Sequence, residues 1–142
     1  MLVREILDLK GRAVLTCVPE DTLAGVVDKL VENNCGSLVV CDAGGQMVGI
    51  ITERDILRAT AHTRGPLDFV RVAERMTRMP VVAAPDDTVA ETMGTMTQHR
   101  IRHLPVIDRG SLVGIISIGD LVKAQHDEVS RENHYLKNYI QS

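Results

Sequence analysis

The hydrophobic and polar positions of this chain follow one order in the first half and the same order again in the second. A short β-type run ends at a proline in each half, at Val14–Val18 and at Val81–Ala84. Thr22 and Thr88 then precede apolar residues at helical spacing, where each threonine is expected to cap a helix. The expected helical stripes are Leu23, Val26, Val27, Leu30 and Val31, and then Val89, Met93, Met96 and Thr97. Each half therefore begins with a strand and a helix.

Two further β-type runs and a second helix follow in each half. The runs are Ser37–Cys41 and Met47–Thr52 in the first half, and His103–Ile107 and Leu112–Ser117 in the second. Only a short turn that contains glycine separates the two runs of each pair, which is typical of a β-hairpin. Helical patterns then run from Glu53 to Thr63 and from Gly119 onward. The pattern predicts the order β-α-β-β-α twice.

The two halves also agree in amino-acid identity. Pro19–Ala24 matches Pro85–Ala90, and Met47–Thr52 matches Leu112–Ser117. The alignment has its gap inside the hairpin turn, where a surface loop tolerates a change of length. A gap in that place, with both flanking strands in register, indicates a true duplication.

The duplication defines the expected domain organisation. A lead-in helix is expected before each repeat, because Val72–Met76 echoes Ile6–Lys10. We expect repeat 1 at residues 1–65, repeat 2 at 66–125 and a helical extension at 126–142. Neither half is long enough for a stable core of its own. The expected fold is therefore α/β (α+β), with the repeats packed about a pseudo-twofold axis.

Each hairpin leads into its second helix through a similar heptapeptide. Gly49–Asp55 reads Gly-Ile-Ile-Thr-Glu-Arg-Asp, and Gly114–Asp120 reads Gly-Ile-Ile-Ser-Ile-Gly-Asp. Glycine, two apolar residues, Thr or Ser, two variable residues and Asp resemble the signature of the cystathionine-β-synthase (CBS) domain. Two copies in register make the chain similar to a tandem CBS pair, or Bateman module, over nearly its whole length. The layout is especially similar to small stand-alone bacterial CBS-domain proteins.

The polar residues of the two heptapeptides suit a nucleotide. Thr52 and Ser117 place a hydroxyl beside the free N–H groups of a helix start, which favours an anion such as phosphate. Asp55 and Asp120 lie one turn further on the same face, where a carboxylate can accept hydrogen bonds from the two hydroxyls of a ribose. A purely structural interpretation is also open, in which the hydroxyls are N-caps and the carboxylates complement the helix dipole. The occurrence of the set in both repeats favours the ligand.

In CBS pairs the resemblance implies two clefts, each formed by residues of both repeats. The first expected set is Thr52, Arg54, Asp55, Val81, Val82, Arg102 and His103. The second expected set is Leu15, Thr16, Gly36, Ser37, Ser117 and Asp120. The residues that align with Arg102 and His103 in the other repeat are uncharged. Only the first set is therefore expected to include cationic side chains suited to phosphate.

The resemblance implies a regulatory module and not an enzyme. Its expected ligand contains adenosine, as AMP, ADP, ATP, NAD(H) and S-adenosylmethionine do, and is a regulatory ligand, not a required cofactor. Its occupancy is expected to reach an unidentified effector protein through movement of helices. The alternative is a ligand-free dimerisation or scaffold module. An enzyme is disfavoured because the sequence holds no recognisable catalytic set.

A subunit contact is expected in the last part of the chain. The segment from Asp120 to Ile140 predicts one long helix, and its apolar stripe has no partner within the repeat. The resemblance implies a homodimer, because four CBS repeats usually assemble into a flat disc. The expected interface uses the helices that follow the signatures, with Ile56, Leu57, Leu121 and Val122.

Composition and charge narrow the partners further. Aromatic residues make up 2% of the chain and the net charge is −3, which disfavours binding of nucleic acid. No apolar run has the length of a membrane span, and residues 1–5 do not resemble a signal peptide, so a cytoplasmic protein is expected. The cysteines form no C-x-x-C pair and suit a reducing compartment. His99 and His103 have the spacing of a helical metal pair, but the β-pattern from His103 onward disfavours a metal site.

Overall fold

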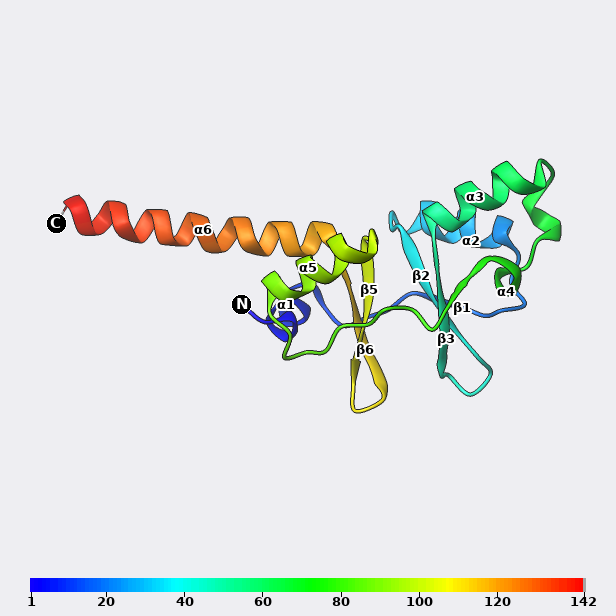
Figure 1. Ribbon diagram of the computed structural model, residues 1–142, viewed down its shortest axis with the longest axis horizontal. Coiled ribbons are helices and arrows are strands. Elements are labelled where there is room, and N and C mark those ends of the chain that lie inside the picture. Colours follow the sequence, from blue (N-terminus) through cyan, green and yellow to red (C-terminus); the bar gives the residue numbers. More distant parts are fainter. Residues whose placement is uncertain (142) are drawn as a thin grey trace. The chain divides into compact units, whose positions relative to one another are not determined.

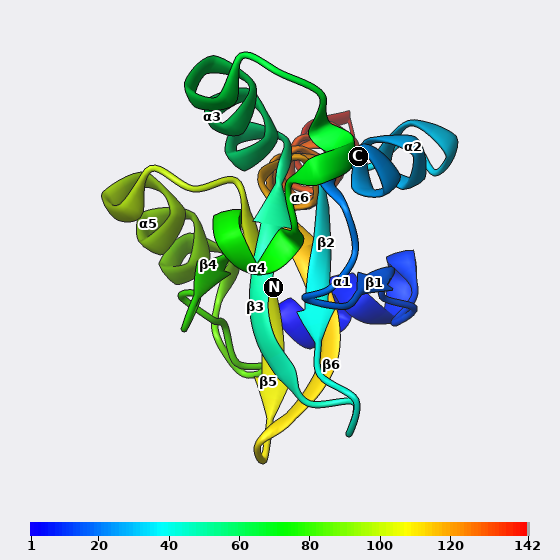
Figure 2. The same cartoon turned by 90° about the vertical axis from the view of Figure 1, so that its right-hand side faces the viewer.

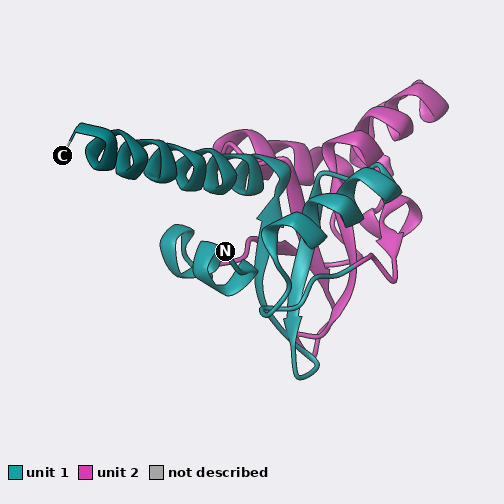
Figure 3. Ribbon diagram, turned by 60° about the vertical axis from the view of Figure 1, so that its left-hand side comes forward, with its two compact units in different colours: residues 1–12, 82–142 teal, residues 13–81 magenta. Residues whose placement is uncertain are grey.

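The computed structural model describes residues 1–141, which group into two compact units (Figures 1 and 3). Unit 2 is continuous and comprises residues 13–81. Unit 1 combines residues 1–12 with the described residues from 82 onward. The first helix of the chain therefore belongs with the second half of the sequence. The division into repeat 1, repeat 2 and a helical extension, with boundaries after residues 65 and 125, remains a prediction.

Unit 2 contains a four-stranded sheet in the order β1-β2-β3-β4. The strands are β1 Thr16–Cys17, β2 Ser37–Cys41, β3 Met47–Thr52 and β4 Thr77–Arg78. β2 pairs with β1 in parallel and with β3 in an antiparallel hairpin, which Figure 2 shows, and β4 pairs antiparallel with β3. The helices are α2 Leu23–Glu32, α3 Glu53–Thr63, a 3-10 turn at Leu67–Phe69 and α4 Val72–Arg75.

Helix α2 forms where the sequence predicts it because Thr22 caps it. The Thr22 hydroxyl oxygen accepts a hydrogen bond from the Gly25 N–H at 3.1 Å. The buried face of α2 consists of Leu23, Val26 and Leu30. Each of these side chains contributes roughly 1.5–3 kcal/mol of hydrophobic stabilisation. Val27 is half-buried and Val31 is 75% exposed, so the apolar stripe is narrower than predicted.

Unit 1 contains, among the described residues, a two-stranded sheet and three helices. The elements are α1 Val3–Lys10, α5 Val89–His99, β5 His103–Asp108, β6 Ser111–Ser117 and α6 Ile118–Gln141. β5 and β6 form an antiparallel hairpin in which Leu104 lies opposite Ile116, and both side chains are fully buried. The two hairpins predicted from the sequence are thus confirmed in the two units.

The buried face of α5 agrees with the prediction at Val89 and Met96 and differs from it at Thr92, Met93 and Thr97. Its buried residues are Val89, Thr92 and Met96. The hydroxyl of Thr92 donates to the Thr88 carbonyl at 2.8 Å, so this polar group is satisfied within the helix. Met93 is half-buried and Thr97 is exposed. The sequence pattern missed Thr92 because a threonine with a self-satisfied hydroxyl packs as an apolar residue.

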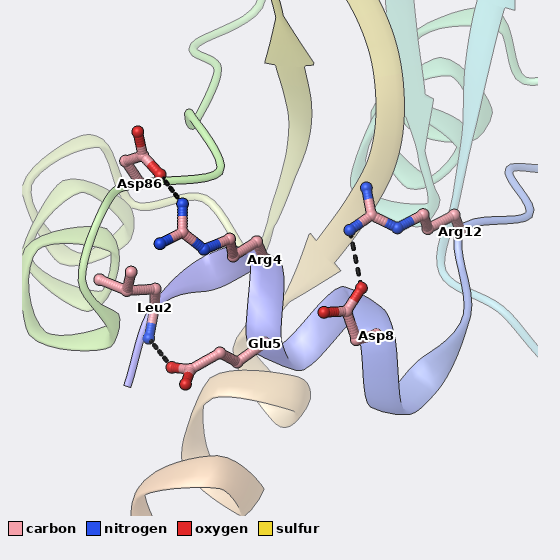
Figure 4. A network of polar contacts seen from close by, with 6 residues as sticks. All are labelled: Leu2, Arg4, Glu5, Asp8, Arg12 and Asp86. Atoms are coloured by element: carbon pink, nitrogen blue, oxygen red, sulfur yellow. Dashed lines mark hydrogen bonds and ion pairs between the residues drawn. The ribbon is translucent and has the colours of Figure 1, made fainter.

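Polar contacts attach α1 to the loop that precedes α5 (Figure 4). The Val3 N–H donates to the Asp87 carbonyl at 2.9 Å, and the Arg4 guanidinium forms an ion pair with Asp86. Figure 4 shows the Arg4 pair together with the contacts Leu2–Glu5 and Asp8–Arg12. The N-terminal helix is therefore an integral part of unit 1.

The two lead-in helices are equivalent, but not in the register expected from the sequence. Leu2 forms an antiparallel bridge to the N-cap threonine of α5, and Arg71 forms the same bridge to the N-cap threonine of α2. In both helices a glutamate accepts a hydrogen bond from the N–H of this bridging residue, at 2.6 and 2.7 Å. Leu2 therefore corresponds to Arg71, so the predicted echo of Ile6–Lys10 with Val72–Met76 is wrong. The helices have 8 and 4 residues, and this unequal length misled the alignment.

The glycines that open the two signatures lie where the lead-in segment crosses the hairpin. A Cβ atom on Gly49 would lie 2.6 Å from the Thr77 carbonyl oxygen, and one on Gly114 would lie 2.6 Å from Cδ2 of Leu7. Both distances are far shorter than van der Waals contact. A side chain at Gly49 would displace the backbone at Thr77, whereas one at Gly114 would require the Leu7 side chain to move, so both glycines have a packing role.

The strand expected at Val81–Ala84 does not form. Only Ala83 is paired, and its N–H donates to the Pro105 carbonyl at 2.9 Å. Prolines on both sides of the segment lack N–H groups, which prevents a longer ladder. A strand forms a few residues earlier in the sequence instead: β4 pairs with β3 at Gly49 and Ile50.

Helix α6 runs without interruption from Ile118 to Gln141, which confirms the long helix predicted from its apolar stripe. Leu121 and Ala124 are buried, whereas the described positions from 125 onward are exposed. The burial of Leu121 contradicts its predicted place in a subunit interface. A side chain with 0% exposure in the single chain cannot contact a second one.

Candidate ligand-binding sites

In unit 2 the signature residues Thr52 and Asp55 form a reciprocal capping box at the start of α3. The Thr52 N–H and hydroxyl both donate to Asp55 Oδ2, at 2.9 and 3.1 Å. In return the Asp55 N–H donates to Thr52 Oγ1 at 3.3 Å. The box fixes a hydroxyl and a carboxylate at the end of β3, and both residues are half-buried.

In unit 1 the residues Ser117 and Asp120 form the same box at the start of α6. The Ser117 N–H donates to Asp120 Oδ2 at 2.9 Å, and the Asp120 N–H donates to Ser117 Oγ at 3.1 Å. In both boxes these hydrogen bonds are accepted by Oδ2, and Oδ1 is the second acceptor atom of each carboxylate. The two heptapeptides therefore fold into one local structure, and the N-cap role proposed for them is real.

A lysine distinguishes the carboxylate of unit 1. Lys10 Nζ donates to Asp120 Oδ2 at 2.6 Å and to the Ile115 carbonyl at 3.0 Å. Burial by itself raises the pKa of Asp120, but the hydrogen bonds from Lys10 and Ser117 outweigh burial, so the pKa lies below its ordinary value. The carboxyl is therefore ionised near neutral pH. Sequence patterns could not reveal this pair, because its partners are 110 positions apart.

Several predicted ligand residues lie beside Thr52 within unit 2. Ser37 is paired with Thr52 in the β2–β3 register, and the Gly36 carbonyl accepts the first N–H of α3 at 3.0 Å. Leu15 and Thr16 lie along β2 at the start of the sheet, where the Leu15 carbonyl accepts a hydrogen bond from β2 at 3.1 Å. The other predicted residues in this unit are Arg54, Asp55 and Val81.

The remaining predicted residues belong to unit 1. His103 is paired with Ser117 in the β5–β6 register, and the Arg102 carbonyl accepts the first N–H of α6 at 2.9 Å. Val82 is 42% exposed. The structure thus brings each hairpin start together with the signature of its own unit. The grouping of Arg102 and His103 with Thr52 and Asp55 stays a prediction.

The described residues provide neither a metal site nor a reactive thiol at Cys17. Across residues 1–141, no three His, Cys, Asp or Glu side chains are grouped closely enough to hold a metal ion. The described cysteines are free thiols, and burial, with a smaller contribution from Asp21, raises the pKa of Cys17 to about 11. Such a thiol is protonated and unreactive at neutral pH. Within the same residues, no helix combines the length and apolar character that crossing a membrane requires.

The CBS-domain family profile matches this chain twice, at residues 3–62 and 71–127. The chain therefore belongs to the CBS-domain family, and the tandem pair predicted from its duplicated signature is confirmed.

Two relatives of this chain differ in how much of their length it matches. The mitochondrial CBS domain-containing protein CBSX3 of Arabidopsis thaliana is 35% identical over 147 residues, which cover 98% of this chain and 71% of that protein. Inosine-5'-monophosphate dehydrogenase of Mycobacterium tuberculosis is 33% identical over 121 residues, which cover 84% of this chain but 22% of the enzyme. The likeness to the enzyme is thus restricted to about a fifth of its length.

Solved structures with the same fold include complexes with adenosine compounds. A CBS-domain protein from Agrobacterium tumefaciens has a TM-score of 0.85 at 40% identity, covering 87% of this chain and 92% of that chain. A CBS-domain protein from Pyrobaculum aerophilum, complexed with AMP, has a TM-score of 0.75 at 30% identity, covering 84% and 89%. The CBS domain pair of the protein MJ0100, in complex with 5'-methylthioadenosine and S-adenosyl-L-methionine, has a TM-score of 0.78 at 27% identity, covering 90% and 98%.

Proposed function

We propose that this chain is a regulatory module that binds an adenosine-containing ligand and transmits its occupancy to a partner protein. The observation that carries the proposal is the repetition of one polar arrangement, a hydroxyl and a carboxylate at a helix start, in both units. The complexes of related CBS pairs with AMP and with S-adenosylmethionine support a ligand of this class. The ligand acts as a signal and not as a cofactor, and the module performs no reaction of its own.

The signature suits a ribose and a phosphate together. The two vicinal hydroxyls of a ribose can donate to a carboxylate, and Oδ1 of Asp55 and of Asp120 is an acceptor suited to them. The positive end of the helix dipole and the N–H groups of its first turn stabilise negative charge nearby. Because the capping box already holds the carboxylate, little side-chain freedom is lost when a ligand binds.

A third capping box in the chain serves as a control, because no ligand is proposed to bind there. Thr88 and Glu91 form the same reciprocal box at the start of α5, with distances of 3.1 and 3.0 Å. No glycine-containing signature strand precedes that helix. Effects that appear at Asp55 or Asp120 but not at Glu91 therefore report on the ligand. The assignment of Arg54, Arg102 and His103 as phosphate partners of the Thr52–Asp55 set is part of the same proposal.

AMP is expected to stabilise the folded chain more than GMP does. A ligand that binds only the folded state adds about 2.7 kcal/mol at 100 times its Kd, which raises the Tm of a chain of this size by roughly 5–10 °C. Differential scanning fluorimetry with GMP and with four adenosine compounds, AMP, ATP, NAD and S-adenosylmethionine, measures the shifts. Equal shifts with AMP and GMP would show that adenine is not recognised. The absence of a shift with all four compounds would favour a ligand-free scaffold module.

We further propose that the chain forms a homodimer through exposed apolar residues. Leu57 is 71% exposed and Val122 is 50% exposed, whereas Ile56 packs partly against the core of unit 2. Along α6, Val129 and Leu136 are 50% and 55% exposed and continue the stripe begun by Val122. Burying such residues in a second chain gains about 25 cal/mol per Å² of apolar surface.

Light scattering at micromolar concentration is expected to give twice the 15.6 kDa mass of one chain. Val129→Asp is expected to shift the mass toward the monomer, because it places an unpaired charge within the interface. The matched control is Glu128→Gln, which changes charge on the same turn outside the apolar stripe. A monomeric wild-type chain would contradict the proposal.

Free thiols at Cys17, Cys35 and Cys41 support a reducing compartment such as the cytoplasm as the site of action.

A further inference from the structure

Lys10 reaches the signature of unit 1 from another element. It is the last residue of α1, and its ammonium group lies between the Ile115 carbonyl oxygen, at 3.0 Å, and Asp120 Oδ2, at 2.6 Å. The side chains of Lys10 and Asp120 are 32% and 23% exposed. The ammonium is therefore held in place by two acceptors and still reaches solvent.

The contacts of this pair leave one donor and one acceptor side by side. A lysine ammonium has three N–H groups, and two of them are used by Ile115 and Asp120. Lys10 and the Ser117 N–H both donate to Oδ2 of Asp120, and Oδ1 is the second acceptor atom of the same carboxylate. A ribose hydroxyl can donate to that oxygen while a phosphate oxygen of the same nucleotide accepts from the ammonium.

Unit 2 has no lysine at the corresponding position. When the two lead-in segments are aligned with Leu2 on Arg71, Lys10 aligns with Met79. Met79 has a left-handed backbone, with φ 49°, and its side chain is 93% exposed. The capping boxes of the two units are thus alike, but the lysine that contacts the carboxylate of unit 1 has no lysine counterpart in unit 2.

We infer that Lys10 is a ligand-binding residue that makes the Asp120 site selective for anionic adenine nucleotides over uncharged adenosine. This inference rests on the proposed function. Without Lys10, the ionised carboxylate of Asp120 faces an incoming phosphate as a like charge. With Lys10, that charge is balanced and a donor is available for the phosphate. The assignment adds a cation to the set of Ser117 and Asp120, for which the sequence predicted none.

Calorimetric titration with AMP and with adenosine tests the role of Lys10 in the full chain. An Asp55→Ala background restricts the measurement to the Asp120 site. Adding Lys10→Met, which keeps the length of the side chain, is expected to weaken AMP binding about tenfold or more and adenosine binding less than about threefold. Lys10→Arg is expected to restore most of the AMP affinity, because it keeps the charge. Lys137→Met, which removes an exposed charge near the end of α6, is the matched control and should change neither affinity.

The outcomes separate this inference from the proposed function. Unchanged AMP affinity in Lys10→Met, with clear binding by the background chain, overturns the role of Lys10 and leaves the proposed function standing. An equal loss for AMP and adenosine shows that Lys10 only positions Asp120, and it overturns the selectivity. If the wild-type chain binds neither AMP nor adenosine, the inference is overturned, and the proposed function fails as well only if ATP, NAD and S-adenosylmethionine are not bound either. Circular dichroism and a thermal melt of each variant establish that it is folded.

Discussion

Asp55→Ala is expected to weaken AMP binding about 10- to 100-fold at its site, because a hydrogen bond to a charged group is worth roughly 1.5–3 kcal/mol. The carboxylate lost is the one that the Thr52 box holds at the start of α3. The titration is made in an Asp120→Ala background, so that one site is measured. The loss of the cap itself costs about 0.5–2 kcal/mol of stability, which leaves the chain folded.

Glu91→Ala controls for the cap. It removes a box of the same form at the start of α5, so it should lower stability by a similar amount and leave AMP affinity unchanged. If Glu91→Ala weakens AMP binding as much as Asp55→Ala does, the binding loss reflects stability and the site assignment is wrong.

Arg102→Ala tests the phosphate partner assigned to the Asp55 site. In the Asp120→Ala background it should weaken AMP binding and leave adenosine binding nearly unchanged, since adenosine has no phosphate. An effect confined to the Asp55→Ala background would instead assign Arg102 to the site of Asp120, whose hairpin it begins.

Gly49→Ala is expected to destabilise the chain by about 1–3 kcal/mol, the usual cost of overpacking. The new Cβ would lie 2.6 Å from the Thr77 carbonyl oxygen, and a backbone atom cannot yield as the end of a flexible side chain can. The β3–β4 pairing must therefore open. Thermal and urea unfolding, followed by circular dichroism, measure the loss.

Gly94→Ala is a control that is expected to raise the stability of the chain instead of lowering it. Gly94 lies inside α5, and a Cβ there would meet no atom within 4 Å. Alanine should therefore stabilise the helix by about 0.5–1 kcal/mol, because glycine loses more backbone entropy on folding. A Gly49→Ala variant as stable as the wild type would refute the close-packing role assigned to the signature glycine.

The parts of the fold that depend on local interactions could be predicted from the sequence. Thr22 and Thr88 marked two helix starts through their caps. The short turn that contains glycine between the β-type runs of β2 and β3 marked a hairpin. The residues of each signature come together because a capping box needs only a spacing of three. For the same reason Thr52 and Asp55 could be paired without a structure.

The parts that depend on distant contacts could not be predicted. β4 is a strand of 2 residues that exists because the lead-in segment crosses β3 at Gly49, and its own sequence has no strand pattern. Leu121 carries the same apolar signal as Val122, but the first is buried and the second is half-exposed. Lys10 resembles any basic residue at a helix end until the tertiary fold brings it to Asp120.

The discontinuous makeup of unit 1 gives the chain an order of assembly during synthesis. Unit 2 is one continuous segment that ends at residue 81, so it can complete its sheet while the rest of the chain is still being made. Helix α1 is synthesised before unit 2, but its partner strand β6 begins only at Ser111. At ribosomal rates of about 5–20 residues per second, α1 waits on the order of 5–20 s for that strand. A helix that is made before unit 2 thus reaches its place only after unit 2 is complete.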